Sequence, residues 1–358
     1  MSKIKPGEAY QGGTVRHVRP YLHGSVVASG ARAKLRSWVA AYDQIVADFF
    51  PRLVEETSRE DFCHACALVE TRGFRIRTSQ HEDAEERGMD RPYGLVPFAD
   101  LLNHRSRSDL RTCDWSFEEE TRSFVIRTGG SRLQKGEEVC LSYGLHANSK
   151  YLGSYGFALE DNRRHDGASP DVAHVHLFGG DSHDPSARDG RYSALAIGDR
   201  EAAEALLSAL RLSVATAAEG RAMVSHAREA ASGRTHAHGG ERGPPPAATS
   251  VCSLPFSPRN ERASMTVLRQ LVVAAIGRYE TTLEEDEGLY GEGKLLAFSR
   301  HRNAVLVRAG EKHVLRHWKT LCDAALTFLD DVAIEKMDWE GYCKVLDATL
   351  GRVVSIAL

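Results

Sequence analysis

The segment that most constrains this chain is residues 94–162, where polar and aromatic residues stand at defined places among apolar runs. One apolar run ends in the pair Asn103-His104, and two tyrosines, Tyr143 and Tyr155, are each followed by glycine. The branched residues before Tyr143 predict a strand over residues 138–143, which would place its phenol at a strand end beside a turn-forming glycine. Tyr155 would follow one short helical segment later. The polar groups of Asn103 and His104 must either face solvent or meet partners that satisfy them.

Three parts of this segment resemble the C-terminal half of a SET domain of the Rubisco large-subunit lysine methyltransferase type. They are residues 96–104 (VPFADLLNH), 136–144 (GEEVCLSYG) and 148–162 (NSKYLGSYGFALEDN). Each part alone is a weak signal, but their combined order and spacing are specific. The resemblance implies an α+β fold with a β-rich SET core and a helical insert, followed by an all-α substrate-binding domain.

Length and charge narrow the class of protein. A chain of 358 residues is long enough for two domains and a well-buried core. Its 46 basic and 49 acidic residues give a net charge of -3, which does not favour nucleic acid as a partner. No apolar run approaches the ~20 residues of a membrane span. The first five residues lack the apolar core of a secretory signal, so we expect neither membrane insertion nor secretion.

The seven cysteines are scattered and odd in number, which is typical of reduced thiols in an intracellular compartment. Cys63 and Cys66 have the spacing of a metal or redox motif, but the chain contains no second pair of this kind. Their segment also has helical character. We therefore predict that they are small buried residues and that the chain has no metal site.

Residues 31–74 have helical periodicity, with apolar residues three and four positions apart. Pro51 would end the first helix, and Ser58 with Asp61 predicts the N-terminal cap of a second. The end of the second helix resembles a V-x-S-R-x-F motif of the family, with Thr71 in place of serine. The resemblance implies that Arg72 pairs with a cofactor carboxylate. From the residues alone, a solvated arginine at a helix C-terminus is an equal alternative.

The first 32 residues match the family least. In the family, an N-terminal strand pair carries a Gly-x-Gly loop that holds the methionine end of S-adenosylmethionine. We find no Gly-x-Gly before an apolar strand here, and the short apolar run at residues 24–28 predicts either a strand or a loose lead-in. We interpret this segment as a remnant of the first SET strands, which implies either a truncated chain or a reduced cofactor site.

The rest of the chain alternates short strands, helices and one low-complexity segment. Alternation predicts a hairpin from residues 113–117 and 123–126 and a strand over 172–177. Gly198-Asp199 opens a predicted helix, and an apolar stripe from Met265 to Tyr279 predicts another. Between them lies a predicted linker, whose His236 and His238 we do not interpret as metal ligands. Several polar segments beyond residue 259 resemble the family's helical substrate-binding domain.

These features predict three regions. Residues 1–32 form an N-terminal segment. Residues 33–162 form the SET domain, with a helical insert at 33–92 and the C-terminal SET half at 93–162. Residues 163–358 form a helical substrate-binding domain with a disordered linker at 233–258.

The resemblance also implies roles for single residues. Tyr143 corresponds to the catalytic tyrosine of SET enzymes. Arg72, Asn103, His104 and Phe157 would hold S-adenosylmethionine, with Phe157 on the adenine and main-chain groups of His104 at the adenine edge. Tyr155 and Trp115 would line the channel for the acceptor side chain. Taken singly, a strand-end tyrosine is ordinarily a packing residue, and an Asn-His pair can simply cap a helix.

The function implied is S-adenosylmethionine-dependent methylation of a protein lysine. Methyl transfer from a sulfonium needs an aligned donor and an uncharged acceptor, and a narrow apolar channel would lower the lysine pKa from its usual value of about 10.4. Two alternatives stay open: a protein-histidine methyltransferase, and a non-catalytic protein-binding module without a complete cofactor site. We expect a monomer in the cytoplasm, with the plastid and nucleus as alternative compartments.

Overall fold

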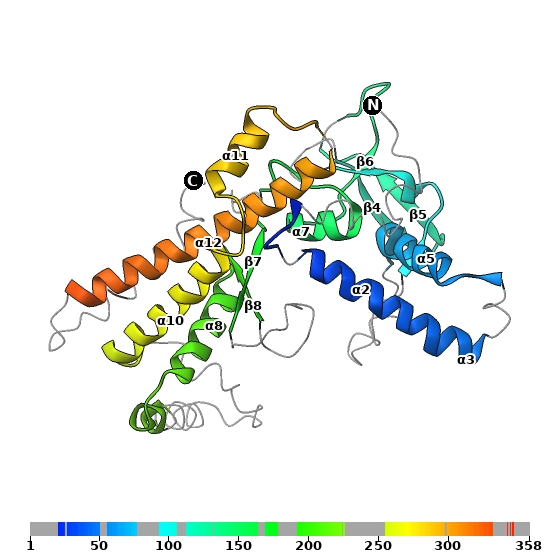
Figure 1. The fold of residues 1–358 in the computed structure, drawn as a ribbon. Helices are drawn as coiled ribbons and strands as arrows, with labels where there is room; N and C mark the ends of the chain where they lie inside the picture. The colour runs from blue at the N-terminus through cyan, green and yellow to red at the C-terminus, as the bar shows by residue number, and fades with distance from the viewer. Residues whose placement is uncertain are drawn as a thin grey trace. The chain divides into compact units, whose positions relative to one another are not determined.

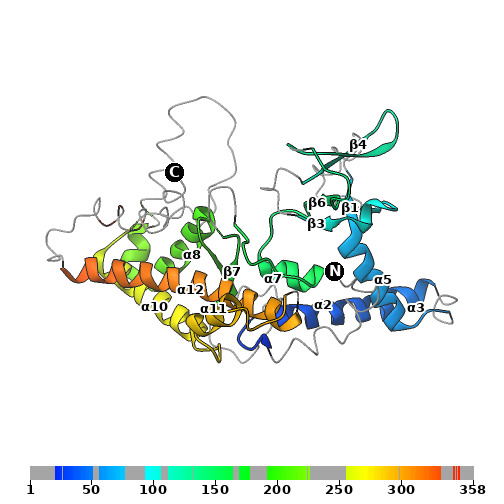
Figure 2. The same cartoon turned by 90° about the horizontal axis from the view of Figure 1, so that it is seen from above.

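The computed structural model describes residues 21–25, 27–50, 56–76, 93–105, 112–130, 132–163, 169–177, 192–223, 225, 255–297, 299–331, 342, 344 and 346. The chain divides into two compact units, which Figure 1 and Figure 2 show as ribbons. Unit 1 comprises residues 1–22, 27–165 and 295–306. Unit 2 comprises residues 23–26, 166–294 and 307–358. The N-terminal segment before residue 21, the linker histidines and residues 77–92 lie outside the described residues.

Helices form the first part of unit 1. Helix α2 (Val27–Ala41) continues through the π-helical turn η2 (Tyr42–Val46) into α3 (Ala47–Phe49), and α5 (Arg59–Arg72) follows. The predicted cap of α5 is confirmed, because Ser58 Oγ accepts from the Asp61 amide over 3.1 Å and Asp61 accepts from the Ser58 amide over 3.2 Å. The strand considered for residues 24–28 is wrong. Gly24 has a φ of 86°, and Val27 already begins α2.

Short strand pairs follow in unit 1. Strand β1 (Gly73–Arg75) pairs antiparallel with β2 (Tyr93–Leu95), and the predicted hairpin is present as β4 (Asp114–Glu118) and β5 (Ser123–Arg127). A 3₁₀ turn, η4 (Ala99–Leu101), leads into β3 (Asn103–His104), which pairs parallel with β6 (Cys140–Leu141). The strand predicted over residues 138–143 is therefore shorter than expected, because its partner β3 offers only two residues for pairing. The short α7 (Asn148–Lys150) and the π-helical η5 (Tyr151–Tyr155) complete the segment.

Unit 2 is mainly helical but also contains a hairpin. Strands β7 (Val172–His176) and β8 (Tyr192–Ala196) pair antiparallel, so a purely helical second domain is corrected to helices plus this sheet. The helices are α8 (Arg200–Ser213), α10 (Pro258–Ile276), α11 (Leu283–Gly291) and α12 (Arg300–Asp331), the last of which begins in unit 1. Pro258, assigned to the linker from the sequence, is in fact the first residue of α10. Ser257 caps this helix by accepting from the Asn260 amide.

One apolar core joins these elements of unit 2. It contains residues of β7, β8, α8, α10 and α12, among them Leu206, Leu268 and Trp318, which are at most 4% exposed. The predicted stripe of α10 is confirmed, since Met265, Leu268 and Val272 are fully buried. Helices α8 and α10 lie side by side with the hairpin against them (Figure 1, Figure 2). Some buried polar residues of unit 2 pair with one another in its interior, as Arg211 does with Glu261.

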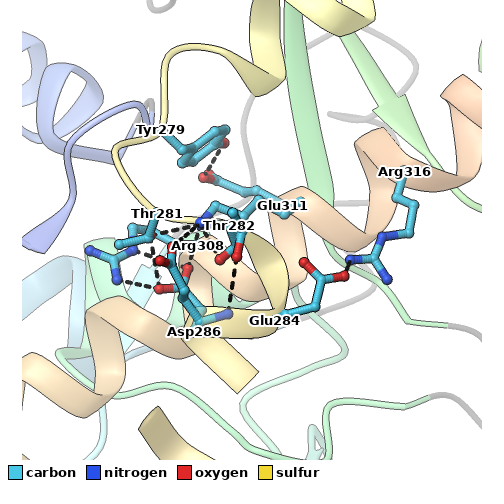
Figure 3. A network of polar contacts seen from close by, with 10 residues as sticks. Tyr279, Thr281, Thr282, Glu284, Asp286, Arg308, Glu311 and Arg316 are labelled. Carbon is cyan, nitrogen blue, oxygen red and sulfur yellow. Dashed lines mark hydrogen bonds and ion pairs between the residues drawn. The ribbon is translucent and has the colours of Figure 1, made fainter. Parts of the chain in front are cut away.

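A buried charge network forms where α11 packs on α12. Asp286 accepts from Arg308 Nη2 over 2.5 Å and from Lys312 Nζ over 2.6 Å, and its side chain is fully buried (Figure 3). Lys312 also donates to Thr281 Oγ1 and to the Thr282 carbonyl. The two cations and one carboxylate therefore satisfy one another in the low-dielectric interior.

Candidate active site

Five rings of unit 1 meet at the segment that the sequence singled out. We define the aromatic cluster as His104, Tyr143, Tyr151, Tyr155 and Phe157. The ring centroids of Tyr143 and Tyr155 are 4.9 Å apart, and those of His104 and Phe157 are 5.6 Å apart and stacked. The structure thus brings together four of the site residues predicted from sequence, namely His104, Tyr143, Tyr155 and Phe157.

Two hydrogen bonds, each between a side chain and a main-chain group, fix Tyr143 just after β6. Its hydroxyl donates to the Leu102 carbonyl over 2.7 Å, and its amide donates to His104 Nδ1 over 3.0 Å. The next residue, Gly144, has a φ of 106°, a conformation that favours glycine. Burial raises the pKa of the Tyr143 phenol to about 12, with a smaller opposing effect from the Arg72 charge. Tyr143 is therefore a neutral phenol whose hydroxyl proton is donated to the Leu102 carbonyl.

His104 is a neutral imidazole with one defined tautomer. Burial, with a further contribution from His146, lowers its pKa to about 4. Because Nδ1 accepts the Tyr143 amide, the ring proton must reside on Nε2. This Nε2 is buried and has no hydrogen-bond partner among the described residues. A buried donor without an acceptor is costly, so this atom is suited to meet an acceptor on a bound molecule.

Asn103 points away from the aromatic cluster. Its side chain is exposed, and Nδ2 donates to Glu138 Oε1 over 2.5 Å. Its main chain pairs with Cys140 in the β3–β6 ladder. The side chain of Asn103 thus supports the strand pair that carries both His104 and Tyr143.

Arg72 ends α5 close to this strand pair. Its Nη1 donates to the Asp100 carbonyl over 2.8 Å and lies 3.7 Å from the Asp100 carboxylate. The side chain is 30% exposed, so Arg72 is a half-buried residue with a fixed partner, not a freely solvated one. A guanidinium has five N–H donors, and these contacts involve only its Nη1 end.

Trp115 belongs to a different group of rings. It stacks on Phe124 at 5.0 Å and meets Phe74 edge-on at 5.3 Å. These contacts join the β4–β5 hairpin to β1. The ring contacts described for Trp115 are with this group and not with the aromatic cluster.

The sequence reasoning missed several residues that hold the aromatic cluster. Tyr151 is 1% exposed and lies in the middle of it. Asn148 exchanges two hydrogen bonds with the main chain of Leu159, and Asn162 Nδ2 donates to the His146 carbonyl over 2.9 Å. A signal was available for Tyr151, because it precedes Tyr155 by four residues and so shares a helical face with it.

The cysteine pair on α5 has the character of packing residues. Cys63 is buried, Cys66 is half-buried, and burial raises the pKa of both thiols. A raised pKa keeps a thiol protonated and unreactive. Within the described residues, no three His, Cys, Asp or Glu side chains are grouped as a metal would require. Nor does any helix in that part of the chain have the length and apolar character needed to cross a membrane.

Comparisons with known proteins show which proteins the chain is similar to. Residues 185–315 match the family described as Rubisco LSMT substrate-binding. Over 272 residues the chain is 29% identical to the chloroplastic Rubisco large-subunit N-methyltransferase of Nicotiana tabacum, covering 72% of this chain and 48% of that protein. It is 37% identical over 103 residues to SET domain-containing protein 4 of Mus musculus, covering 28% of this chain and 22% of that protein. The chain thus spans about half or less of these curated relatives.

Solved structures show the same fold. A structure of Rubisco LSMT bound to AdoMet superposes with a TM-score of 0.60 at 19% identity, covering 94% of this chain and 71% of that one. A second, of the SET domain of LSMT bound to lysine and AdoHcy, gives a TM-score of 0.59 over 93% of this chain and 70% of that one. The predicted α+β fold with a SET core and a mainly helical second domain is confirmed. The chain is thus similar in sequence and fold to SET-domain methyltransferases of the Rubisco LSMT type, and its residues 185–315 match the substrate-binding domain of that family.

Proposed function

We propose that this chain is an S-adenosylmethionine-dependent protein-lysine N-methyltransferase. The observation that carries the proposal is the placement of Tyr143, a neutral phenol tied to the Leu102 carbonyl and packed between His104 and Tyr155. Two relatives are named as lysine N-methyltransferases, one of Arabidopsis thaliana and a ribosomal one of Saccharomyces cerevisiae, and the tobacco relative is named as an N-methyltransferase.

The residues of the site fit S-adenosylmethionine. The buried Nε2–H of His104 lacks an acceptor, which a nitrogen or oxygen of the cofactor would supply. Phe157 offers a ring on which an adenine would stack, and the guanidinium of Arg72 suits a carboxylate. Asn103 would contribute through the main chain of β3, because its side chain is bonded to Glu138. When bound, the cofactor supplies a methyl group on a sulfonium, and no covalent enzyme intermediate is needed.

Tyr143 would act as a hydrogen-bond acceptor toward the reacting groups. Since its proton is donated to Leu102, the phenol oxygen keeps lone pairs available. These accept weak hydrogen bonds from an electron-poor methyl group, which help to orient it. With a pKa of about 12, the phenol stays neutral throughout the physiological range.

The acceptor lysine would have to lose its proton before it reacts. A ring-lined site disfavours the ammonium form, and the nearby charge of Arg72 acts in the same direction. Tyr155 would form one wall of the acceptor channel, since its ring centroid is 4.9 Å from that of Tyr143. We also propose Trp115 as a wall of this channel. Its ring contacts Phe74 and lies on the β4–β5 hairpin, outside the aromatic cluster.

A non-catalytic protein-binding module is the second candidate. It is supported by the match of residues 185–315 to a substrate-binding domain, which does not itself require the SET core. Such a module would use the substrate-binding domain without methyl transfer. Protein-histidine methylation differs only in the acceptor and is separated by identifying the methylated residue.

Domain boundaries, oligomeric state and compartment accompany the proposal. We propose a SET domain at residues 33–162, preceded by the segment 1–32 and followed by the substrate-binding domain at 163–358, in a monomeric protein. A cytoplasmic location stays our prediction. The plastid is the first alternative, because the tobacco and Arabidopsis relatives are named as chloroplastic.

The test is calorimetric titration of S-adenosylmethionine into the 358-residue chain. We expect micromolar binding that weakens in Arg72→Ala and persists in Arg59→Ala, a control at the opposite, exposed end of α5. Tyr143→Phe should bind the cofactor and lose methyl transfer to a lysine-centred peptide pool. No binding at millimolar cofactor would contradict the enzyme proposal and favour the binding module.

A further inference from the structure

Tyr151 is the most deeply buried ring of the aromatic cluster. Its side chain is 1% exposed. Its ring stacks on Phe157 at 5.1 Å and lies 5.0 Å from His104 and 6.3 Å from Tyr155. Tyr151 therefore contacts three residues that the proposed function places at the cofactor or the acceptor.

The hydroxyl of Tyr151 makes a contact outside the aromatic cluster. Its hydroxyl donates a 2.6 Å hydrogen bond to the carbonyl of Gly144, the residue directly after Tyr143. Gly144 is in the left-handed region, and a Cβ there would lie 2.9 Å from His146 Nε2. The turn thus requires glycine, which has no side chain of its own to anchor it. The Tyr151 hydroxyl supplies an anchor from the neighbouring helix.

We propose that Tyr151 is a positioning residue for Tyr143: its hydroxyl holds the Gly144 carbonyl and so fixes the direction in which the Tyr143 phenol is presented. The inference rests on the proposed methyl transfer for its kinetic consequence. The dependence of the Tyr143 position on the Tyr151 hydroxyl does not require that the chain transfers methyl groups. Tyr151 does not donate to Tyr143 itself, so its effect is exerted through the turn.

Unit 1 contains a matched control bond. Tyr42 is 6% exposed, and its hydroxyl donates to the Thr57 carbonyl, also over 2.6 Å. This bond links η2 to the start of α5 and involves no residue of the aromatic cluster. Tyr42→Phe and Tyr151→Phe therefore remove the same chemical bond at two places, and only one of them adjoins Tyr143.

The first experiment is NMR of the full chain labelled with ¹³Cζ-tyrosine. Among the 11 tyrosines, the signal of Tyr143 is identified by its loss in Tyr143→Phe. We expect Tyr151→Phe to shift or broaden this signal and Tyr42→Phe to leave it unchanged. A Tyr143 signal identical in wild type and folded Tyr151→Phe would overturn the inference. If Tyr151→Phe does not fold, Gly144→Ala strains the same turn from the other side and should displace the same signal, and an unchanged signal there would overturn it equally.

The second experiment measures transfer from tritiated S-adenosylmethionine to a lysine-centred peptide pool. We expect kcat to fall on the order of tenfold in Tyr151→Phe while cofactor affinity is unchanged, because the loss is one of alignment. A kcat equal to that of wild type in folded Tyr151→Phe would contradict the inference. A wild-type chain that transfers no methyl group would count against the proposed function, while the NMR result still decides the role of Tyr151.

Discussion

The main-chain amide of Tyr143 donates a 3.0 Å hydrogen bond to Nδ1 of His104, a residue 39 positions earlier in the chain. This bond ties the end of β6 to β3 beyond the last pair of their ladder. It also fixes the tautomer of His104, whose ring proton is carried by the buried Nε2. One contact thus couples the position of the proposed catalytic tyrosine to the chemistry of its neighbour.

We predict that His104→Leu loosens the Tyr143 backbone and that His104→Asn largely preserves it. The asparagine oxygen can replace Nδ1 as the acceptor, whereas leucine leaves a buried amide unpaired at a cost of about 1–3 kcal/mol. Hydrogen exchange of the Tyr143 amide should be faster in His104→Leu than in His104→Asn. Equal exchange rates in the two variants would show that this hydrogen bond does not stabilise the Tyr143 backbone.

The stability of the chain should depend on pH through His104. Its pKa is about 4 in the folded state against 6.5 for the free side chain, so the unfolded chain binds more protons between these values. The contribution of the neutral His104 ring to the free energy of unfolding is therefore complete above pH 6.5 and is lost as the pH falls toward 4. We expect it to amount to about 1–2 kcal/mol, since the ring is partly exposed. Urea titrations of His104→Asn should show a shallower decline across this window than wild type, whereas the exposed His64→Asn should follow wild type.

A second pH effect, of opposite sign, is expected in unit 2 from Glu311. This carboxyl is buried, accepts from Ser25 Oγ over 2.9 Å and from the Tyr279 hydroxyl over 2.8 Å, and burial raises its pKa to about 7 (Figure 3). The folded state keeps the proton longer than the unfolded chain, whose acid titrates near 4.5. The contribution is present below pH 4.5 and is lost as the pH rises through 7.

Glu311→Gln replaces the carboxyl with an amide that does not ionise, so the variant does not lose this stability as the pH rises. We expect the variant to be more stable than wild type at pH 8 by up to roughly 3 kcal/mol and to gain little at pH 5. Unfolding free energies at the two pH values check this. Glu284→Gln, at an exposed ion pair with Arg316, is the control and should change little at either pH. A variant that is less stable at pH 8 would show that the charged form of Glu311 is satisfied in the folded state.

Asp286→Asn should be strongly destabilising. The substitution leaves Arg308 and Lys312 buried without their counter-charge, which costs about 3–5 kcal/mol in comparable buried pairs. Urea unfolding is the measurement. Asp323→Asn is a close control, because Asp323 also bridges an arginine and a lysine but is 39% exposed, and we expect a loss below about 1 kcal/mol there. Similar losses of unfolding free energy in both variants would contradict the prediction that burial makes the Asp286 substitution the more costly one.

Local signals in the sequence predicted the elements that depend on neighbouring residues. The Ser58–Asp61 cap of α5 is made by residues three positions apart, and the β4–β5 hairpin follows an alternation visible in two short runs, residues 113–117 and 123–126. The stripe of α10 was equally local. These predictions are confirmed because backbone geometry alone brings such residues together.

Predictions failed where a partner distant in sequence sets the outcome. Strand β6 is limited to Cys140 and Leu141, which pair with the two residues of β3, and Val27 begins a helix where a strand was one of two alternatives. The β7–β8 hairpin was half predicted, since only its first strand has a clear alternation. The importance of Tyr151 was missed because its partner, Gly144, lies in a turn whose geometry the sequence does not reveal.

The sequence by itself determined the class of fold, the order of the two domains and the identity of the residues that resemble a methyl-transfer site. It did so because helix caps, alternation and motif spacing are properties of short segments. Only the tertiary structure decided which of those residues meet. It brought His104, Tyr143, Tyr155 and Phe157 into one aromatic cluster with Tyr151, left the Asn103 side chain exposed and put Trp115 in another ring group. The physical reason is that burial and hydrogen bonding between distant segments, which fix tautomers and pKa values as well as positions, exist only once the chain is folded.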